Sequence, residues 1–397
     1  SQKCCRSIYH SEGSEMSRRK IMVLSGTRSE YGLLKPVMKS IEEDSRLELV
    51  VVATGSHLEE RYGKTISEIK EDGFRILAEI KLGLGNSNKD MANALAQCIT
   101  TLTSIMVECK PDIVVVLGDR VETLGTVLAA YYLNIPIAHI HGGDKSIGGH
   151  LDDNARHAIT KLSHIHFAAT EESAERIKKL GEEEWRVHVV GAPGLDSIRN
   201  RKFPGKNELY SRLGLDTEKK TAVILQHPVT TEAAQAAQQI SETLLSTSES
   251  GCQMVIIYPN ADAGSVDMIR EIEKFAANRN VKIFKSMSHD EYIALLKYTD
   301  VLVGNSSSGI IEAPLFRLPF VNVGTRQLGR ERTANVIDVV YNRDEIARAI
   351  RKAMSPEFRK KLTGKNVYGD GSAGKRIAQV LASMDINKKL IQKQITY

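Results

Sequence analysis

Short apolar runs alternate along the chain with longer stretches in which apolar residues recur every three or four positions. From residue 21 onward, the apolar runs predict β-strands at residues 21–24, 47–53, 113–117, 137–140, 166–169 and 187–190. The amphipathic stretches between them predict helices at residues 33–44, 91–109, 121–133 and 155–162. Continuously apolar strands that are separated by helices are typical of a parallel sheet covered on both faces. The first half of the chain is therefore predicted to be a doubly wound α/β domain.

The same alternation restarts in the second half, with predicted strands at residues 222–225, 253–258, 281–284, 301–303 and 320–323. Residues 200–219 interrupt it with mixed charge and a Pro-Gly pair, and are predicted to be a linker. We expect two Rossmann-like domains, at residues 20–199 and 200–372, with a cleft at the carboxyl ends of their strands. A last helix, within residues 373–397, is expected to pack back on the first domain.

The composition sets the broad class of protein. The 397 residues are 42% hydrophobic and 26% charged, and the net charge is +5. This length allows two cores, and no apolar run is long enough to span a bilayer. The basic runs are short and lack interleaved aromatic residues, so a nucleic-acid surface is not expected. Five cysteines without a CxxC spacing favour a reducing compartment, which predicts a cytoplasmic protein.

Residues 1–19 are treated as an extension outside the fold. The first fifteen are mostly polar, lack the apolar core of a signal peptide and precede Met16. We expect this segment to be disordered or foreign to the natural chain.

The clearest candidate binding site follows the predicted strand 301–303. The loop GNSSSG, with Ser306 and Ser307 in its middle, leads into a helix predicted over residues 310–316, and Ser307 or Ser308 is a natural N-cap. Free N–H groups at a helix N-terminus favour an anion. Glu312 in this helix would accept hydrogen bonds from two neighbouring ribose hydroxyls, and Arg326 follows the next strand. Together they favour a nucleotide diphosphate over an ordinary strand-to-helix turn.

Other polar residues stand directly after predicted strands. Asp119 and Arg120 follow residues 113–117, and His227, held extended by the proline after it, follows residues 222–225. Asn260 follows the next strand. Arg28 lies in the loop after the first strand, which lacks GxGxxG and so argues against a nicotinamide cofactor. For Arg28, a surface role is an equal alternative.

Six histidines between residues 139 and 166 raise the question of a metal site. His139 and His141 would share one face of a strand, as HxH ligands do. No Glu or Cys completes a known ligand spacing, and His157 and His164 lie two turns apart. We expect no metal, with packing roles for most of these histidines; a metal-dependent hydrolase is the minor alternative.

Taken together, the motifs TRSEYG, GDR, HIHGGD, LDDNARHAITKLSH, QHPVTT, YPNADAG, GNSSSGIIE and GTRQLGRE resemble the hydrolysing UDP-N-acetylglucosamine 2-epimerases of sialic-acid and related nonulosonic-acid pathways. The resemblance covers residues 21–376. It implies a GT-B fold, a UDP-sugar substrate, no cofactor and a homodimer or homotetramer. The nucleotide contacts that it implies are Arg28, Arg120, His227, Asn260, Met287 (through its backbone), Ser306, Ser307, Glu312 and Arg326. The catalytic positions that it implies are Asp119, Asp152 and His227.

The chain departs from this family at one position. The mammalian form has a catalytic Glu just before the Gly-Gly pair, where this chain has His141, and Asp144 follows the pair. A longer loop, at residues 145–150, comes next. Either His141 or Asp144 is expected to take over the proton transfer.

The reaction that the resemblance implies is an elimination followed by hydration. Loss of UDP creates an oxocarbenium-like centre at C1 of the sugar, which acidifies the proton on C2. The resulting 2-acetamidoglycal then adds water and becomes the free manno sugar. A non-hydrolysing 2-epimerase, a GT-B glycosyltransferase and a non-catalytic nucleotide-sugar sensor are the alternatives.

Overall fold

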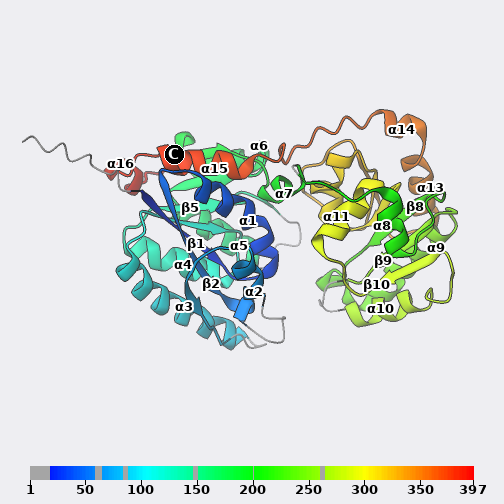
Figure 1. The fold of residues 1–397 in the computed structure, drawn as a ribbon, viewed down its shortest axis with the longest axis horizontal. Helices are drawn as coiled ribbons and strands as arrows, with labels where there is room; N and C mark the ends of the chain where they lie inside the picture. Colours follow the sequence, from blue (N-terminus) through cyan, green and yellow to red (C-terminus); the bar gives the residue numbers. More distant parts are fainter. Residues whose placement is uncertain (1–17, 59–64, 84–87, 146–150, 200, 260–263) are drawn as a thin grey trace, which may run out of the picture.

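Two α/β domains follow one another in a computed structural model that describes residues 18–58, 65–83, 88–145, 151–199, 201–259 and 264–397. They lie side by side along the long axis of the molecule (Figure 1). The chain enters the second domain after helix α7 (Asp196–Arg199) and returns to the first at helix α15 (Ala373–Ser383). The predicted pair of doubly wound parallel sheets is confirmed.

The N-terminal domain is built on a seven-stranded parallel sheet with the strand order β3-β2-β1-β4-β5-β6-β7. Its strands are β1 (Arg19–Ser25), β2 (Leu47–Thr54), β3 (Ile76–Ile80), β4 (Ile113–Leu117), β5 (Ile137–Ile140), β6 (Ile165–Ala168) and β7 (Val187–Val189). The helices are α1 (Arg28–Glu43), α2 (Ile66–Glu71), α3 (Asn88–Cys109), α4 (Val121–Tyr132), α5 (Leu151–Leu162) and α6 (Glu171–Lys179). The strand order reverses between β1 and β4, which is where ligands bind in open α/β sheets.

The C-terminal domain repeats this architecture on six parallel strands, ordered β10-β9-β8-β11-β12-β13. The strands are β8 (Thr221–Leu225), β9 (Gln253–Ile257), β10 (Val281–Phe284), β11 (Val301–Gly304), β12 (Phe320–Val323) and β13 (Val336–Val339). Its helices are α8 (Lys206–Leu213), α9 (Ala236–Ser248), α10 (Ser265–Glu273), α11 (His289–Tyr298), α12 (Ser308–Ile311), α13 (Arg343–Ala353) and α14 (Pro356–Lys360). Among the described residues, no helix has both the length and the apolar character needed to cross a membrane.

Two sequence predictions are wrong in detail. The predicted linker contains helix α8, whose Leu209 and Tyr210 are fully buried in the core of the second domain. The helix predicted over residues 310–316 divides at Glu312 into the four-residue α12 and a 3-10 turn, Ala313–Phe316. Pro314 opens this turn and cannot supply the backbone N–H that a continuous α-helix needs.

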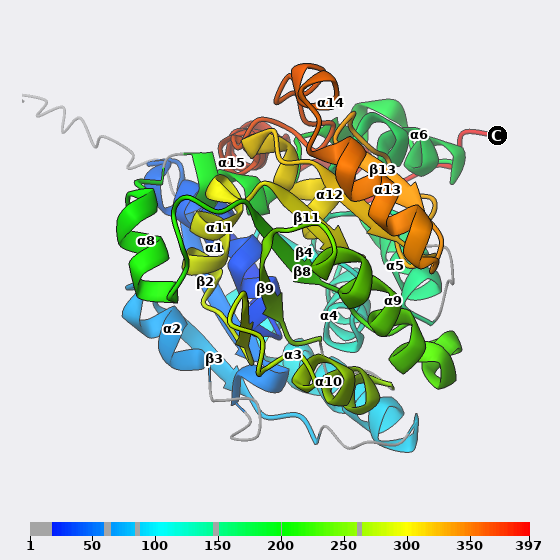
Figure 2. The same ribbon diagram turned by 90° about the vertical axis from the view of Figure 1, so that its right-hand side faces the viewer.

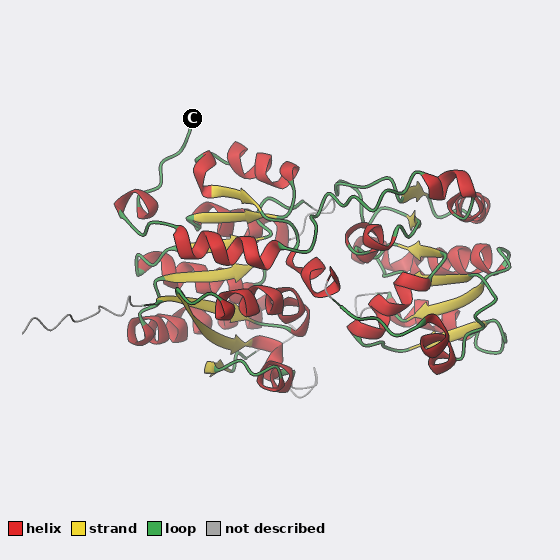
Figure 3. Ribbon diagram, turned by 45° about the horizontal axis from the view of Figure 1, so that its top comes forward, coloured by secondary structure: helices red, strands yellow, loops and turns green. Residues whose placement is uncertain are grey.

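The strand ends of the two sheets face each other. Figure 3 shows the arrows of the N-terminal sheet pointing toward the C-terminal domain. The loops after β5 and β6 line one pocket together with the loop after β12. The fold therefore gathers the residues that follow strands in both domains around one cleft.

Helix α15 packs against α1 of the first domain. The backbones approach so closely that a Cβ on Gly374 would lie 2.7 Å from the carbonyl oxygen of Pro36. Asp196 holds the start of α15, because its carboxylate accepts hydrogen bonds from the backbone N–H groups of Ala373, at 2.9 Å, and Gly374, at 2.6 Å. The return of the chain to the first domain is fixed at this point.

A buried cluster of charges fixes the last segment, which follows helix α16 (Lys388–Ile391). The carboxylate of Glu182 lies 2.9 Å from Nζ of Lys161, 3.1 Å from Nε2 of His166 and 2.6 Å from Nζ of Lys393. Burial alone would raise the pKa of Glu182, but the hydrogen bonds from these three residues outweigh it and hold the pKa at about 2. Glu182 is therefore ionised and fully paired.

Glu182→Gln is expected to reduce the free energy of unfolding by about 3–5 kcal/mol, because it leaves the largely buried Lys393 without its counter-charge. Urea denaturation at pH 7 measures this loss. A carboxylate with a lowered pKa contributes stability above its unfolded pKa, near 4.5, and loses that contribution as the pH falls toward 2. The gap between wild type and variant should therefore shrink below pH 4.5. Glu184→Gln, on an exposed side chain, is the control; an equal loss there would contradict the assignment.

Candidate active site

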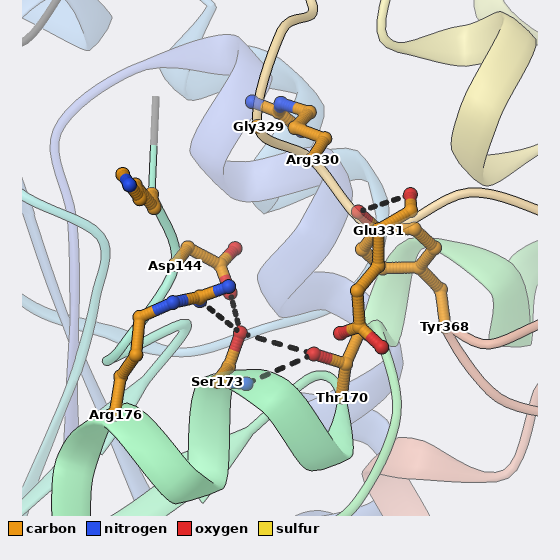
Figure 4. Close-up of a pocket in the computed structure, with 9 residues that line it drawn as sticks. Asp144, Thr170, Ser173, Arg176, Gly329, Arg330, Glu331 and Tyr368 are labelled. Carbon is orange, nitrogen blue, oxygen red and sulfur yellow. Dashed lines mark hydrogen bonds between the residues drawn. The ribbon is translucent and has the colours of Figure 1, made fainter. Parts of the chain in front are cut away.

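The interdomain pocket is lined by charged and hydroxyl side chains from both domains (Figure 4). The N-terminal domain contributes Asp144, Lys145, Thr170, Ser173 and Arg176, and the C-terminal domain contributes Gly329, Arg330, Glu331 and Tyr368. This chemistry suits a polar, charged ligand more than an apolar one.

The predicted residues His141 and Asp144 contact each other on the N-terminal wall of this pocket. Nδ1 of His141 lies 3.1 Å from one oxygen of Asp144, and Ser173 donates a 2.8 Å hydrogen bond to the other. Burial would raise the pKa of Asp144, but the bonds from His141 and Ser173 and the charge of Arg330 hold it below its usual value. Asp144 is therefore a carboxylate that orients an imidazole.

The backbone around this pair is strained. His141 has φ +64°, in the left-handed region that residues with a Cβ seldom occupy. At Gly143, which has φ +76°, a Cβ would lie 2.2 Å from the carbonyl oxygen of Ser173, so only glycine fits. Strain of this kind persists where the surrounding structure enforces it, and it clusters at functional sites.

Arg156 links the acids that follow β4 and β5, and sequence reasoning missed it. Its guanidinium pairs with the carboxylate of Asp119. It also donates hydrogen bonds to the carboxylate of Asp153, at 2.7 Å, and to the carbonyl oxygen of Asp144, at 2.8 Å. Asp119 is thereby held at the cleft by a side chain from α5. Asp152 lies in the first turn of the same helix, and its side chain is outside the described part.

Arg28 and Arg120 stand at the switch point of the N-terminal sheet, after β1 and β4. Nε of Arg28 lies 2.9 Å from the carboxylate of Glu68, and the Arg28 side chain is 65% exposed. Nε of Arg120 lies 3.4 Å from the carboxylate of Glu122. Two predicted arginines are thus placed at neighbouring strand ends.

On the opposite wall, the loop after β11 requires two glycines. Gly304 has φ +134°, and a Cβ there would lie 2.2 Å from the carbonyl oxygen of Leu225. A Cβ on Gly309 would lie 2.3 Å from the ring of Phe320. Close backbone packing therefore explains this pair. Ser307 occupies the N-cap position of α12, as predicted, but its side chain makes no capping hydrogen bond.

Glu312 has the signature of an unfilled binding position. Its Oε2 is buried and has no hydrogen-bond partner among the described residues. Burial raises the pKa of Glu312, while a hydrogen bond from Ser308 and the charge of Arg330 oppose the rise. Buried polar atoms in folded proteins normally have partners, so this oxygen is available to a ligand.

Asn305 organises the second wall and was also missed. It is fully buried, and its side chain accepts a 2.7 Å hydrogen bond from the backbone N–H of His227 and returns a 2.9 Å bond to the carbonyl oxygen of His227. Its own carbonyl oxygen accepts bonds from Gln327, at 2.8 Å, and from Arg326, at 3.2 Å. The side-chain amide and the backbone carbonyl of Asn305 therefore join His227, the small-residue loop and Arg326.

A family model described as UDP-N-acetylglucosamine 2-epimerase matches residues 39–382. The chain belongs to the UDP-N-acetylglucosamine 2-epimerase family. A UDP-N,N'-diacetylbacillosamine 2-epimerase (hydrolyzing) from Legionella pneumophila is 39% identical over 96% of this chain and 100% of its own length. A UDP-N-acetylglucosamine 2-epimerase from Neisseria meningitidis is 34% identical over 85% of this chain and 88% of its own. The resemblance to the hydrolysing branch is confirmed.

The fold of the family is confirmed as well. The crystal structure of a UDP-GlcNAc 2-epimerase from Neisseria meningitidis bound to UDP-GlcNAc superposes with a TM-score of 0.78, at 21% sequence identity. It covers 91% of this chain and 99% of that one. The two domains therefore have the GT-B fold of the 2-epimerases.

Several expected contacts of this 2-epimerase family member remain predictions. Asn260 lies outside the described residues. Met287 lies half-buried between β10 and α11. Arg330 belongs to the motif GTRQLGRE but was not predicted to be a site residue. In the described structure its guanidinium lines the pocket and forms no hydrogen bond or ion pair.

The histidines of the N-terminal sheet are occupied by packing contacts. His139 lies 2.8 Å from the carbonyl oxygen of Gly118, and burial lowers the pKa of His139 to about 3. His164 accepts a bond from the backbone of Ile137, and His166 contacts Glu182. In the parts of the chain described, no three His, Cys, Asp or Glu side chains come close enough to hold a metal ion.

Proposed function

We propose that the chain is a hydrolysing 2-epimerase that converts a UDP-2-acetamido sugar to UDP and the free manno-configured sugar. The observation that carries the proposal is the arrangement of charges across one cleft. Arg330 lies close enough to influence both Asp144, on the N-terminal wall, and Glu312, on the C-terminal wall. In a nucleotide sugar the diphosphate lies between the ribose and the reacting sugar. In the cleft, the cationic Arg330 likewise lies between Glu312, assigned to the ribose, and Asp144, assigned to the sugar.

The nucleotide half of the substrate binds to the C-terminal wall. Glu312 accepts hydrogen bonds from the ribose hydroxyls through its unpartnered oxygen. The remaining contacts come from the strand-end residues Arg28, Arg120, His227, Asn260, Met287, Ser306, Ser307 and Arg326. The arginines and the loop N–H groups stabilise the diphosphate as its charge grows on departure.

The sugar half reacts against the N-terminal wall. In the elimination, the bond between C1 and the UDP oxygen breaks and its electron pair leaves with UDP, while the C2 proton passes to a protein base. The carboxylates of Asp119 and Asp152 stabilise the cationic sugar, and the His141–Asp144 pair moves a proton. In the hydration that follows, the hydroxyl of a water molecule adds to C1. A proton adds to C2 on the face opposite to the one from which the first proton was removed, which inverts that centre.

We place the enzyme in nonulosonic-acid synthesis, which uses free manno-configured sugars of this kind, on the strength of the motif resemblance. We further propose that it acts in the cytoplasm as a homodimer or homotetramer. The three described cysteines, Cys98, Cys109 and Cys252, are free thiols, as a reducing compartment requires.

Incubation in deuterated water with UDP-N-acetylglucosamine, and separately with UDP-N,N'-diacetylbacillosamine, tests the reaction. We expect UDP and a free 2-epimerised sugar that carries one deuterium at C2, detected by NMR and mass spectrometry, at a rate that EDTA does not change. An epimerised sugar still attached to UDP would identify the non-hydrolysing reaction instead. Activity lost in EDTA and restored by zinc would favour the metal-dependent hydrolase.

Glu312→Ala is expected to weaken UDP binding by about 1–3 kcal/mol, the cost of leaving ribose hydroxyls unpaired in a buried site. Titration calorimetry with UDP measures this change. Glu357→Ala, on an exposed residue of α14 in the same domain, should leave the affinity unchanged. Unaltered UDP binding by the Glu312 variant would show that this carboxylate does not face the nucleotide.

Asp119→Asn is expected to reduce turnover by about 10²-fold or more while UDP binding survives, because the charge that stabilises the cationic sugar is lost. Deuterium uptake at C2 should fall together with UDP release, since both require the same intermediate. If the variant released UDP at the wild-type rate, the carboxylate role would pass to Asp152 or Asp144.

A further inference from the structure

Glu122 is a buried carboxylate at the topological switch point of the N-terminal sheet. It lies in the first turn of α4, directly after β4, and is 1% exposed. Both of its carboxylate oxygens lack a hydrogen-bond partner among the described residues. Oε2 of Glu122 forms an ion pair with Arg120, whose Nε lies 3.4 Å away.

A second buried acid, Glu30, lies beside it. Oε2 of Glu30 accepts a 2.9 Å hydrogen bond from the backbone N–H of Gly26. A Cβ on Gly26 would lie 3.0 Å from Oε2 of Glu30 and 3.5 Å from the carboxyl carbon of Glu122. The two carboxyl groups therefore flank the same glycine, immediately after β1.

The surrounding backbone makes room for this pair. Gly55, directly after β2, has φ +62°, and a Cβ there would lie 2.5 Å from Oε1 of Glu122. The two acids therefore lie among the ends of β1, β2 and β4, next to Arg120. On the other side, the thiol of Cys98 in α3 contacts the backbone carbonyl oxygen of Glu122, at 3.5 Å.

Burial favours a proton on Glu30. Burial and the charge of the neighbouring Glu122 raise the pKa of Glu30 to about 7, against the opposing charge of Arg120 and the backbone bonds from Gly26 and Thr27. A second negative charge near Glu122 is costly in a buried site, so Glu30 holds a proton below pH 7.

Such an arrangement costs stability. A buried carboxylate without hydrogen bonds pays for its desolvation without compensation, unlike Glu182, which has three partners in the same domain. A glutamine or an apolar side chain at position 122 would avoid the cost. The residue is therefore better explained by what it does to Arg120.

We propose that Glu122 is a positioning residue: its carboxylate holds the Arg120 guanidinium at the edge of the cleft for the diphosphate. The inference rests on the proposed function, in which Arg120 contacts the nucleotide. A proton on the neighbouring Glu30 keeps a second negative charge away from Arg120, so the arginine keeps its attraction for phosphate.

Glu122→Gln keeps the shape of the side chain and removes its charge. We expect UDP affinity, measured by calorimetry, to fall about tenfold, as for the loss of one charge-assisted contact. KM for the UDP-sugar should rise by a similar factor with a smaller change in kcat, and Tm should stay equal or rise. The matched control is Glu182→Gln, which should show the opposite pattern, with a lower Tm and unchanged UDP affinity.

A double-mutant cycle isolates the coupling between the two residues. In an Arg120→Gln background, Glu122→Gln should cause no further loss of UDP affinity, because there is no guanidinium left to position. Additive losses in UDP affinity would overturn the proposal.

Glu30→Gln tests the proton on Glu30. A carboxyl group whose pKa is raised from 4.5 to about 7 contributes stability that is present below 4.5 and is lost as the pH rises through 7. The Tm of Glu30→Gln relative to wild type should therefore increase between pH 4.5 and pH 8. A Tm difference that does not vary with pH would contradict the raised pKa of Glu30.

The outcomes separate this inference from the proposed function. If the wild-type protein binds no UDP, both fail. If it binds UDP and Glu122→Gln binds it equally well, the inference fails alone. If Glu122→Gln and the apolar variant Glu122→Met are both less stable than wild type, the carboxylate has a structural role and the inference is again overturned.

Discussion

The parallel arrangement of the strands is the constraint on which the site depends. The carboxyl ends of all strands in a parallel sheet lie at one edge. A polar residue directly after a strand therefore lies at that edge, whatever residues surround it in the folded protein. Asp119 follows β4, His141 follows β5, His227 follows β8 and Arg326 follows β12. Two such sheets that face each other by these edges produce a cleft whose two walls are specified separately along the chain.

Each wall is then held together by one polar residue with several hydrogen-bonding partners. On the N-terminal side the guanidinium of Arg156 joins Asp119, Asp153 and the backbone of Asp144. On the C-terminal side the side-chain amide of Asn305 bonds to the backbone of His227, and the Asn305 carbonyl oxygen accepts from Arg326. A guanidinium offers several donors, and an asparagine residue offers both donors and acceptors, which suits each to link several groups at once.

The sequence predicted the central strands of both sheets and the edge strands β7 and β10, but missed the edge strands β3 and β13. β3 (ILAEI) and β13 (VIDV) carry exposed residues within them, so neither forms a continuous apolar run. For the site, Asp119 and His227 could be predicted as candidates from their positions directly after strands. Arg156 and Asn305 act through tertiary contacts with residues far apart in the sequence. A local sequence pattern cannot predict such contacts. Their only signals were an arginine three residues after Asp153 and an asparagine among the serines of the anion loop.

Buried charge is used in two different ways within the same domain. Glu182 is paired with two lysines and contacts a histidine, and removing its charge would leave the largely buried Lys393 unpaired, so its environment is one that stabilises the fold. Glu122 is surrounded by a second acid and one arginine that stands at the cleft, so its environment stabilises an orientation rather than the fold. The first cluster lies where the chain ends and the second where β1 meets β4. Their positions agree with their energetics, because a domain tolerates poorly compensated charge only where a ligand or a partner charge completes the arrangement.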